Sequence, residues 1–163
     1  MSDSGVQLYF AYGSNMYEPR LQSRVPSARY YDVARLPGYC LVFAKRGADG
    51  SAKCDLEPFE PETAWGVVYC IDAGERPLLD EAEGEGYQPM EVRVATGEQF
   101  LDAFTYRARP AWRSEALLPY AWYRDTVAAG AREHGLPEVY IAAIEAMDSQ
   151  PDPDEQQASD TSG

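Results

Sequence analysis

The sequence predicts an α+β fold, a small β-barrel or strongly curved sheet of about six strands with flanking helices. Two observations support this prediction. Short apolar and aromatic runs of the kind found in strands fill the first two thirds of the chain, whereas helical periodicity dominates the last third. Because strands and helices are segregated rather than alternating, the pattern favours α+β over repeated βαβ units.

The expected strands are short and are bounded by residues typical of turns. The first ends abruptly at Gly13-Ser14-Asn15, and the second and third lie on either side of a Pro37-Gly38 turn. The fourth is continuous and apolar, as in a strand buried on both faces. The six strands are expected at residues 6–12, 28–34, 39–44, 64–71, 90–94 and 99–107.

Helices are expected mainly after residue 70, with one short helix that could begin at Met16. Asp72 could cap a second helix in a capping box with Glu75, and Gly84 would end it. We expect residues 118–134 to be mostly helical, with the helix ending at Gly135. A last helix starts at Pro137, and its apolar residues recur at intervals of three and four, which predicts one buried stripe: Tyr140, Ile141, Ile144 and Met147.

The charge of the chain excludes several kinds of partner. With 27 acidic and 14 basic residues, the net charge is −13, which argues against binding to nucleic acid or to anionic lipid. No apolar run approaches the length of about 20 residues that spans a bilayer. Residues 1–5 have neither the basic nor the apolar segment of a secretory signal, so we expect a cytoplasmic location.

The acidic residues are unevenly distributed. Residues 148–163 contain five acids, two prolines and no base, which predicts a disordered acidic tail after one domain at residues 1–147. An alternative is that this tail is an interaction module. The oligomeric state is left open, with a homodimer as one alternative.

The first candidate site is the turn that follows the first strand. Tyr12-Gly13-Ser14-Asn15 joins a buried strand to a turn of small residues, whose successive backbone N–H groups can bind a carboxylate or an oxyanion. The alternative is an ordinary turn in which Ser14 or Asn15 caps the next helix.

The second candidate is Glu83, at the expected end of a helix. It lies four residues after Leu79, so it shares a core-facing side of the helix, whereas Asp80 and Glu81 should face solvent. Burial, nearby acids and the helix dipole would all raise the pKa of Glu83, which suits a group that takes up and returns a proton. The alternative is a solvated acidic helix end.

Other chemistry has little support. Cys40, Cys54 and Cys70 are widely spaced and odd in number, so they predict small buried residues rather than disulfides or a metal site. The single histidine, His134, is expected to stabilise a helix C-terminus. No metal or cofactor is therefore expected.

Several segments resemble the γ-glutamylcyclotransferase family over residues 7–147. The most specific are Tyr9–Met16, with its Tyr-Gly-Ser-Asn sequence, and Leu79–Gly84, with its Glu-Gly end. Further segments are similar in the same order: Ala34-Arg35-Leu36, Trp65-Gly66-Val67-Val68 and His134-Gly135-Leu136-Pro137.

The resemblance implies a small mixed barrel that releases 5-oxoproline from a small γ-glutamyl compound without metal or cofactor. It implies that Glu83 is the general acid/base. The substrate-binding residues that it implies are Tyr9, Phe10, Ala11, Tyr12, Gly13, Ser14, Asn15, Tyr87 and Tyr106. The alternative function is non-catalytic binding of a small ligand by the same fold. The leaving group could be an amino acid, a dipeptide or another amine.

Overall fold

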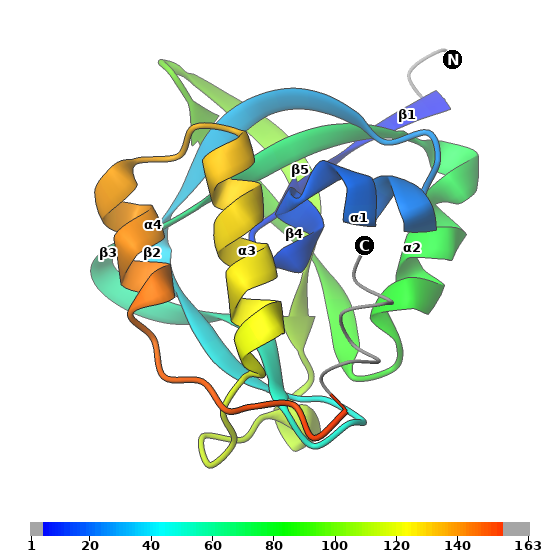
Figure 1. Ribbon diagram of the computed structural model, residues 1–163. Helices are drawn as coiled ribbons and strands as arrows, with labels where there is room; N and C mark the ends of the chain where they lie inside the picture. The colour runs from blue at the N-terminus through cyan, green and yellow to red at the C-terminus, as the bar shows by residue number, and fades with distance from the viewer. Residues whose placement is uncertain (1–4, 155–163) are drawn as a thin grey trace.

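Five strands close into a barrel in the computed structural model, which describes residues 5–154 (Figure 1). The strands are β1 (Val6–Ala11), β2 (Arg29–Arg46), β3 (Ala52–Asp72), β4 (Tyr87–Thr96) and β5 (Gln99–Ala108). The α-helices are α1 (Glu18–Arg24), α2 (Arg76–Glu83), α3 (Ala121–Glu133) and α4 (Glu138–Glu145). Short 3-10 turns are η2 (Ser14–Met16), η3 (Ala73–Glu75) and η4 (Pro110–Trp112).

The barrel is mixed, as the family resemblance implied. The strand order is β1-β3-β2-β4-β5, and every neighbouring pair is antiparallel except the closing pair of β1 and β5. In that parallel pair, Tyr9 lies opposite Phe104. Closure leaves β1 between β3 and β5, so the turn that follows β1 emerges at one end of the barrel.

The strand count is five because the second and third expected strands are one. β2 runs without interruption from residue 29 to residue 46, and Pro37-Gly38 forms an irregularity in its pairing with β3 rather than a turn. Gly38 has a φ of 86°, which a glycine adopts without strain. Since β3 is long enough to pair on both sides of this point, the chain continues as a bent strand.

The structure confirms the predicted end of α2 and the predicted start of α4, but not the predicted capping box. α2 ends at Gly84, which has a φ of 84°, and α4 begins directly after Pro137. The capping box is wrong, because Asp72 makes no side-chain cap and the Glu75 carboxylate instead accepts a hydrogen bond from Ser27 N at 2.8 Å.

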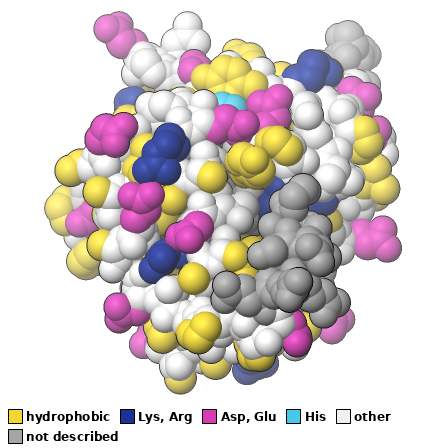
Figure 2. Space-filling view, viewed as in Figure 1, with side chains coloured by type: hydrophobic (Ala, Val, Ile, Leu, Met, Phe, Trp, Pro, Cys, Tyr) yellow, Lys and Arg dark blue, Asp and Glu magenta, His cyan; other side chains and the backbone are white. Residues whose placement is uncertain are grey.

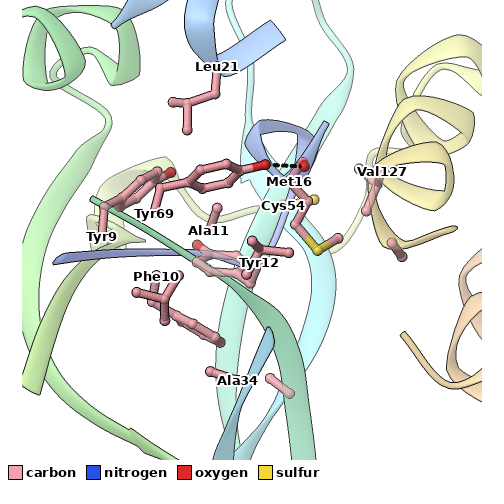
Figure 3. Close-up of a cluster of buried hydrophobic side chains, with 14 of the residues drawn as sticks. Tyr9, Phe10, Ala11, Tyr12, Met16, Leu21, Ala34, Cys54, Tyr69 and Val127 are labelled. Atoms are coloured by element: carbon pink, nitrogen blue, oxygen red, sulfur yellow. Dashed lines mark hydrogen bonds between the residues drawn. The ribbon is translucent and has the colours of Figure 1, made fainter. Parts of the chain in front are cut away.

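Buried aromatic side chains lie on both faces of the barrel wall and support the turn after β1. Phe10 and Tyr69 are both fully buried, and they point to opposite faces because Tyr69 is paired with Tyr9. Figure 3 shows the Tyr69 hydroxyl donating a hydrogen bond to the backbone carbonyl of Met16, at 2.7 Å. β3 therefore holds η2 through a buried polar contact.

Helix α3 covers the same turn from outside the barrel. Figure 1 shows α3 and α4 side by side, with α1 next to α2. Close packing of α3 on the turn depends on Gly130, where an added Cβ would come within 2.5 Å of Tyr17 N and 2.8 Å of Met16 Cβ. The turn is thus held between the barrel and a helix.

The part of the predicted tail within the described residues contacts the start of α3. Gln150 N donates to the carbonyl of Pro119 at 2.9 Å, and Trp122 Nε1 donates to Asp152 at 2.8 Å. The rest of the predicted tail, residues 155–163, lies outside the described residues.

The described surface mixes charges of both signs. On the face shown in Figure 2, acidic, basic and apolar side chains are interspersed. Within residues 5–154, every helix falls short of the length and apolar character needed to cross a membrane.

We expect Gly130→Ala to destabilise the protein, although alanine normally favours a helix. The added methyl group meets backbone atoms of the turn that cannot move independently, so the free energy of unfolding should fall by about 1–3 kcal/mol. Urea denaturation measures this change. The control is Gly74→Ala, whose added methyl meets no atom within 4 Å. A Gly130→Ala protein as stable as the wild type would show that the packing is looser than described.

Candidate active site

A cavity of about 170 Å³ lies where the turn after β1, the end of α2 and the β2–β3 hairpin meet. Eight of the ten predicted site residues line it: Tyr9, Tyr12, Gly13, Ser14, Asn15, Glu83, Tyr87 and Tyr106. The structure therefore brings together segments that are as much as 97 positions apart in the sequence, from residue 9 to residue 106.

Phe10 and Ala11, also predicted to bind substrate, do not line this cavity. Both side chains are fully buried in the barrel core. Phe10 lies against Gly66 of β3, where an added Cβ would come within 2.7 Å of the ring. We therefore assign these two side chains to packing beneath the site.

The turn after β1 is a compact helical turn. Met16 N donates to the carbonyl of Gly13 at 3.0 Å, and Tyr17 N donates to that of Ser14 at 3.1 Å. The first N–H groups of such a turn have no partner within it. A side chain at Gly13 is excluded by Cys54, because an added Cβ would lie 2.9 Å from Cys54 Cβ.

Glu83 projects from the last residue of α2 toward the cavity. Only 13% of its side chain is exposed. Asn15 Nδ2 donates to Glu83 Oε2 at 3.1 Å, and Arg24 Nη1 lies 3.7 Å from the same oxygen. The helix periodicity is confirmed at this position, since Leu79 is fully buried and Glu81 is exposed.

Burial raises the pKa of the Glu83 carboxyl above its ordinary value, because the charged form loses hydration. The positive charges of Arg24, Lys45 and Arg20 and the hydrogen bond from Asn15 oppose this rise. The direction predicted from the sequence agrees with this result, but the charged neighbours are cations rather than the acids that were expected. The Glu83 carboxylate is therefore desolvated, and its positive and hydrogen-bonding neighbours offset part of the resulting rise in its pKa.

Asp80 is exposed, as predicted, but it also makes a contact at the cavity that the sequence did not reveal. Its carboxylate accepts a hydrogen bond from the hydroxyl of Tyr106. The bond forms because α2 and β5 meet at this edge of the cavity. Asp80 therefore orients a tyrosine that lines the site.

Three further tyrosines of the site are fixed by their own hydroxyl groups. Tyr12 donates to the carbonyl of Tyr106 at 2.6 Å, and Tyr87 donates to that of Cys54 at 2.6 Å. The Tyr9 hydroxyl accepts the second bond from Asn15 Nδ2, at 3.1 Å. Burial raises the pKa of each of these tyrosines, so they are neutral hydrogen-bonding groups at neutral pH.

Four basic residues in the cavity were not identified from the sequence: Arg20, Arg24, Lys45 and Lys53. The two arginines lie four residues apart on α1, a spacing that places them on one helix face and could have drawn notice. The two lysines flank a Gly-containing loop, and only the pairing of β2 with β3 shows that they meet.

Neither Cys54 nor His134 is placed as a reactive group of the site. Burial raises the pKa of the Cys54 thiol to about 12, so it is uncharged at neutral pH. His134 immediately follows α3, and its Nε2 lies 2.9 Å from the Tyr69 hydroxyl, outside the lining of the cavity. Within residues 5–154, His, Cys, Asp and Glu side chains form no group of three or more that could hold a metal ion.

Comparisons with known proteins agree with this arrangement. Residues 63–144 match the AIG2-like family. The γ-glutamylcyclotransferase of Bos taurus is 32% identical over 149 residues, which cover 86% of this chain and 78% of that protein. The human γ-glutamylcyclotransferase is 33% identical with the same coverage.

The chain belongs to the γ-glutamylcyclotransferase family. A solved structure of a γ-glutamyl cyclotransferase has the same architecture, with a TM-score of 0.85 at 27% sequence identity. The match covers 97% of this chain and 99% of that one. The family resemblance seen in the sequence is thereby confirmed, and with it the mixed-barrel fold of γ-glutamylcyclotransferases.

We expect Asn15→Ala to raise the pKa of Glu83 further. The Asn15 bond stabilises the charged carboxylate, so its loss favours the protonated form. Titration of the Glu83 side-chain carboxyl by ¹³C NMR measures both values. The wild-type midpoint should lie above the ordinary value of about 4.3, and that of Asn15→Ala above the wild type.

The matched control is Gln22→Ala, on the exposed side of α1, which should leave the Glu83 titration unchanged. A midpoint that stays the same or falls in Asn15→Ala would contradict the described environment of Glu83.

Proposed function

We propose that this protein is a γ-glutamylcyclotransferase, which releases 5-oxoproline from a γ-glutamyl compound with Glu83 as the general acid/base. One observation carries the proposal: a desolvated carboxylate with a raised pKa faces a cavity beside the Tyr-Gly-Ser-Asn turn, in a member of this family. A carboxyl group with this property can both accept and donate a proton.

The first step is a cyclisation within the substrate. The α-amino nitrogen attacks the γ-carbonyl carbon, a new C–N bond forms, and the carbonyl oxygen takes up the negative charge. A free α-amine has a pKa of about 8, so it is mostly protonated at neutral pH and must lose a proton to react. Glu83 accepts that proton. Because both reacting groups belong to one bent molecule, holding the bend accounts for much of the rate gain.

The second step expels the leaving group. The tetrahedral intermediate re-forms its carbonyl as the bond to the leaving nitrogen breaks. Glu83 gives its proton to that nitrogen and takes the second proton of the ring nitrogen, which still carries two hydrogens and a positive charge after the attack. The leaving group departs as a neutral amine, then takes up this second proton from Glu83, and the carboxylate is restored. Two protons thus pass from the attacking nitrogen to the leaving nitrogen, and no side-chain nucleophile is needed.

The turn after β1 is proposed to hold the anionic part of the glutamyl group. Its backbone N–H groups can bind either the α-carboxylate or the developing oxyanion. Arg20 adds positive charge there, since its Nε donates to Ser14 Oγ at 3.0 Å. The tyrosines at positions 9, 12, 87 and 106 form the walls that keep the substrate bent.

We expect Glu83→Gln to lose at least about a hundredfold in kcat, since general acid/base catalysis typically contributes about 10²- to 10⁴-fold. Binding of the γ-glutamyl compound should change much less, because proton transfer occurs in the transition state. The assay measures 5-oxoproline released from γ-glutamylalanine by the purified protein.

Two measurements complete this test. Glu81→Gln, an exposed carboxylate on the same helix, should stay within about threefold of the wild type, as do most substitutions that make no contact with substrate. Because ionisation of Glu83 is disfavoured in the folded state, it removes stability as the pH rises through its raised pKa. Above that pKa, Glu83→Gln should therefore unfold at a temperature no lower than the wild type. Near-normal turnover in Glu83→Gln, or an equal loss in Glu81→Gln, would refute the assignment.

A further inference from the structure

Two lysines lie directly opposite each other on the wall of the cavity. Lys45 of β2 is paired with Lys53 of β3, and both side chains line the cavity. Like charges at directly opposite positions of two antiparallel strands destabilise the pair. The repulsion between the two ammonium groups lowers the stability of the folded protein unless a negative charge lies between them.

One of the two lysines is already neutralised. Lys53 Nζ lies 3.1 Å from a carboxylate oxygen of Asp49, within the loop of the same hairpin. Lys45 has no such partner: among the described residues, none forms a hydrogen bond or an ion pair with its Nζ. The residue is nevertheless only 8% exposed.

The position of Lys45 is built into the fold. Its Nζ lies 4.9 Å from the centre of the Tyr87 ring and 5.0 Å from that of Trp112, within range of favourable cation–π contact. Space for its stem depends on Gly86, where an added Cβ would come within 2.6 Å of Lys45 Cε. The ammonium group is therefore held in place before any ligand arrives.

The cavity has more positive charges than the carboxylates of a γ-glutamyl conjugate of a neutral amino acid can balance. Once Glu83 has accepted the amine proton, the carboxyl group beside Arg24 is neutral. Three cations of the cavity then have no carboxylate partner within residues 5–154: Arg20, Arg24 and Lys45. A γ-glutamyl compound whose leaving group is a neutral amino acid offers two carboxylates. A third carboxylate, on the side chain of the leaving group, balances the site.

We propose that Lys45, with Lys53 beside it, forms a subsite for the side-chain carboxylate of an acidic leaving group, which makes γ-glutamyl conjugates of acidic amino acids the favoured substrates. This inference rests on the proposed function for the identity of the glutamyl part. Burial lowers the pKa of Lys45, and a bound carboxylate would offset that effect by favouring the charged ammonium.

The test compares two ligands that differ only in this charge, γ-glutamylglutamate and γ-glutamylglutamine. Their dissociation constants are measured by calorimetry on the full-length Glu83→Gln protein, which should bind both without turnover. We expect the glutamate compound to bind roughly ten- to a hundredfold more tightly, as for a hydrogen bond between charged groups. Adding Lys45→Met should reduce this preference to within about threefold, since the remaining lysine is paired with Asp49.

The control variant is Arg46→Met, which removes an exposed positive charge at the next residue of β2 and should retain the preference. Equal affinities for the two ligands, no binding of either, or a preference that survives Lys45→Met would overturn the proposal. Because the two ligands are first compared on a protein that retains Lys45, the proposal can fail even if the Lys45 variant does not fold.

A parallel assay separates this inference from the proposed function. If wild-type protein releases 5-oxoproline from both compounds at equal kcat/KM, and binding shows no preference, the proposed function stands and the subsite does not. If binding is selective but no 5-oxoproline forms, the subsite stands and the proposed function fails.

Discussion

The hydrogen bond from Asn15 to Glu83 joins the two segments on which the site depends. One segment is the turn after β1, which is held between Tyr69 of β3 and helix α3, whose close approach depends on Gly130. The other is the end of α2, where Leu79 anchors the helix in the core one turn before Glu83. Because both ends of this bond are fixed by packing, the carboxylate stays buried at the cavity instead of turning toward solvent. A carboxylate free to rotate outward would recover its hydration, and its pKa would return to the ordinary value.

The charged residues that line the cavity are mainly basic, whereas the chain as a whole is acidic. The protein carries a net charge of −13, yet four of its 14 basic residues line one cavity with Glu83 as the acidic residue among them. Burial disfavours ionisation of Glu83, and the surrounding cations favour it. These opposed effects leave a carboxyl group whose pKa is raised, while nearby cations still favour its charged form. A single acid/base residue that carries protons between two nitrogens must be able to adopt both protonation states. In the proposed mechanism, the same cations attract the substrate carboxylates that the acidic surface would otherwise repel.

Local patterns in the sequence were enough to predict the α+β class, the turn after β1 and the placement of Glu83, whereas the mixed barrel was implied by the family resemblance. The turn and the placement of Glu83 depend on spacing within a few residues, such as the four positions between Leu79 and Glu83 or the glycine that ends α2. The features that were not predicted depend on pairing between distant segments. Pro37-Gly38 forms an irregularity rather than a turn because β3 continues alongside it, and Lys45 meets Lys53 only through the register of those two strands. In the same way, the Tyr106 hydroxyl donates a hydrogen bond to Asp80 because α2 meets β5, and helix periodicity alone does not reveal this contact.

The proposed mechanism requires Glu83 to exchange a proton with the substrate's α-amine inside this cavity. A crystal structure of the Glu83→Gln protein with unreacted γ-glutamylalanine tests this requirement, because the ligand is caught before cyclisation. We expect a bent ligand, with its amino nitrogen within hydrogen-bonding distance of the side chain at position 83 and its glutamyl carboxylate near the turn after β1. An extended ligand, or one whose amino group points to the cavity mouth while another side chain contacts the γ-carbonyl, would contradict the mechanism.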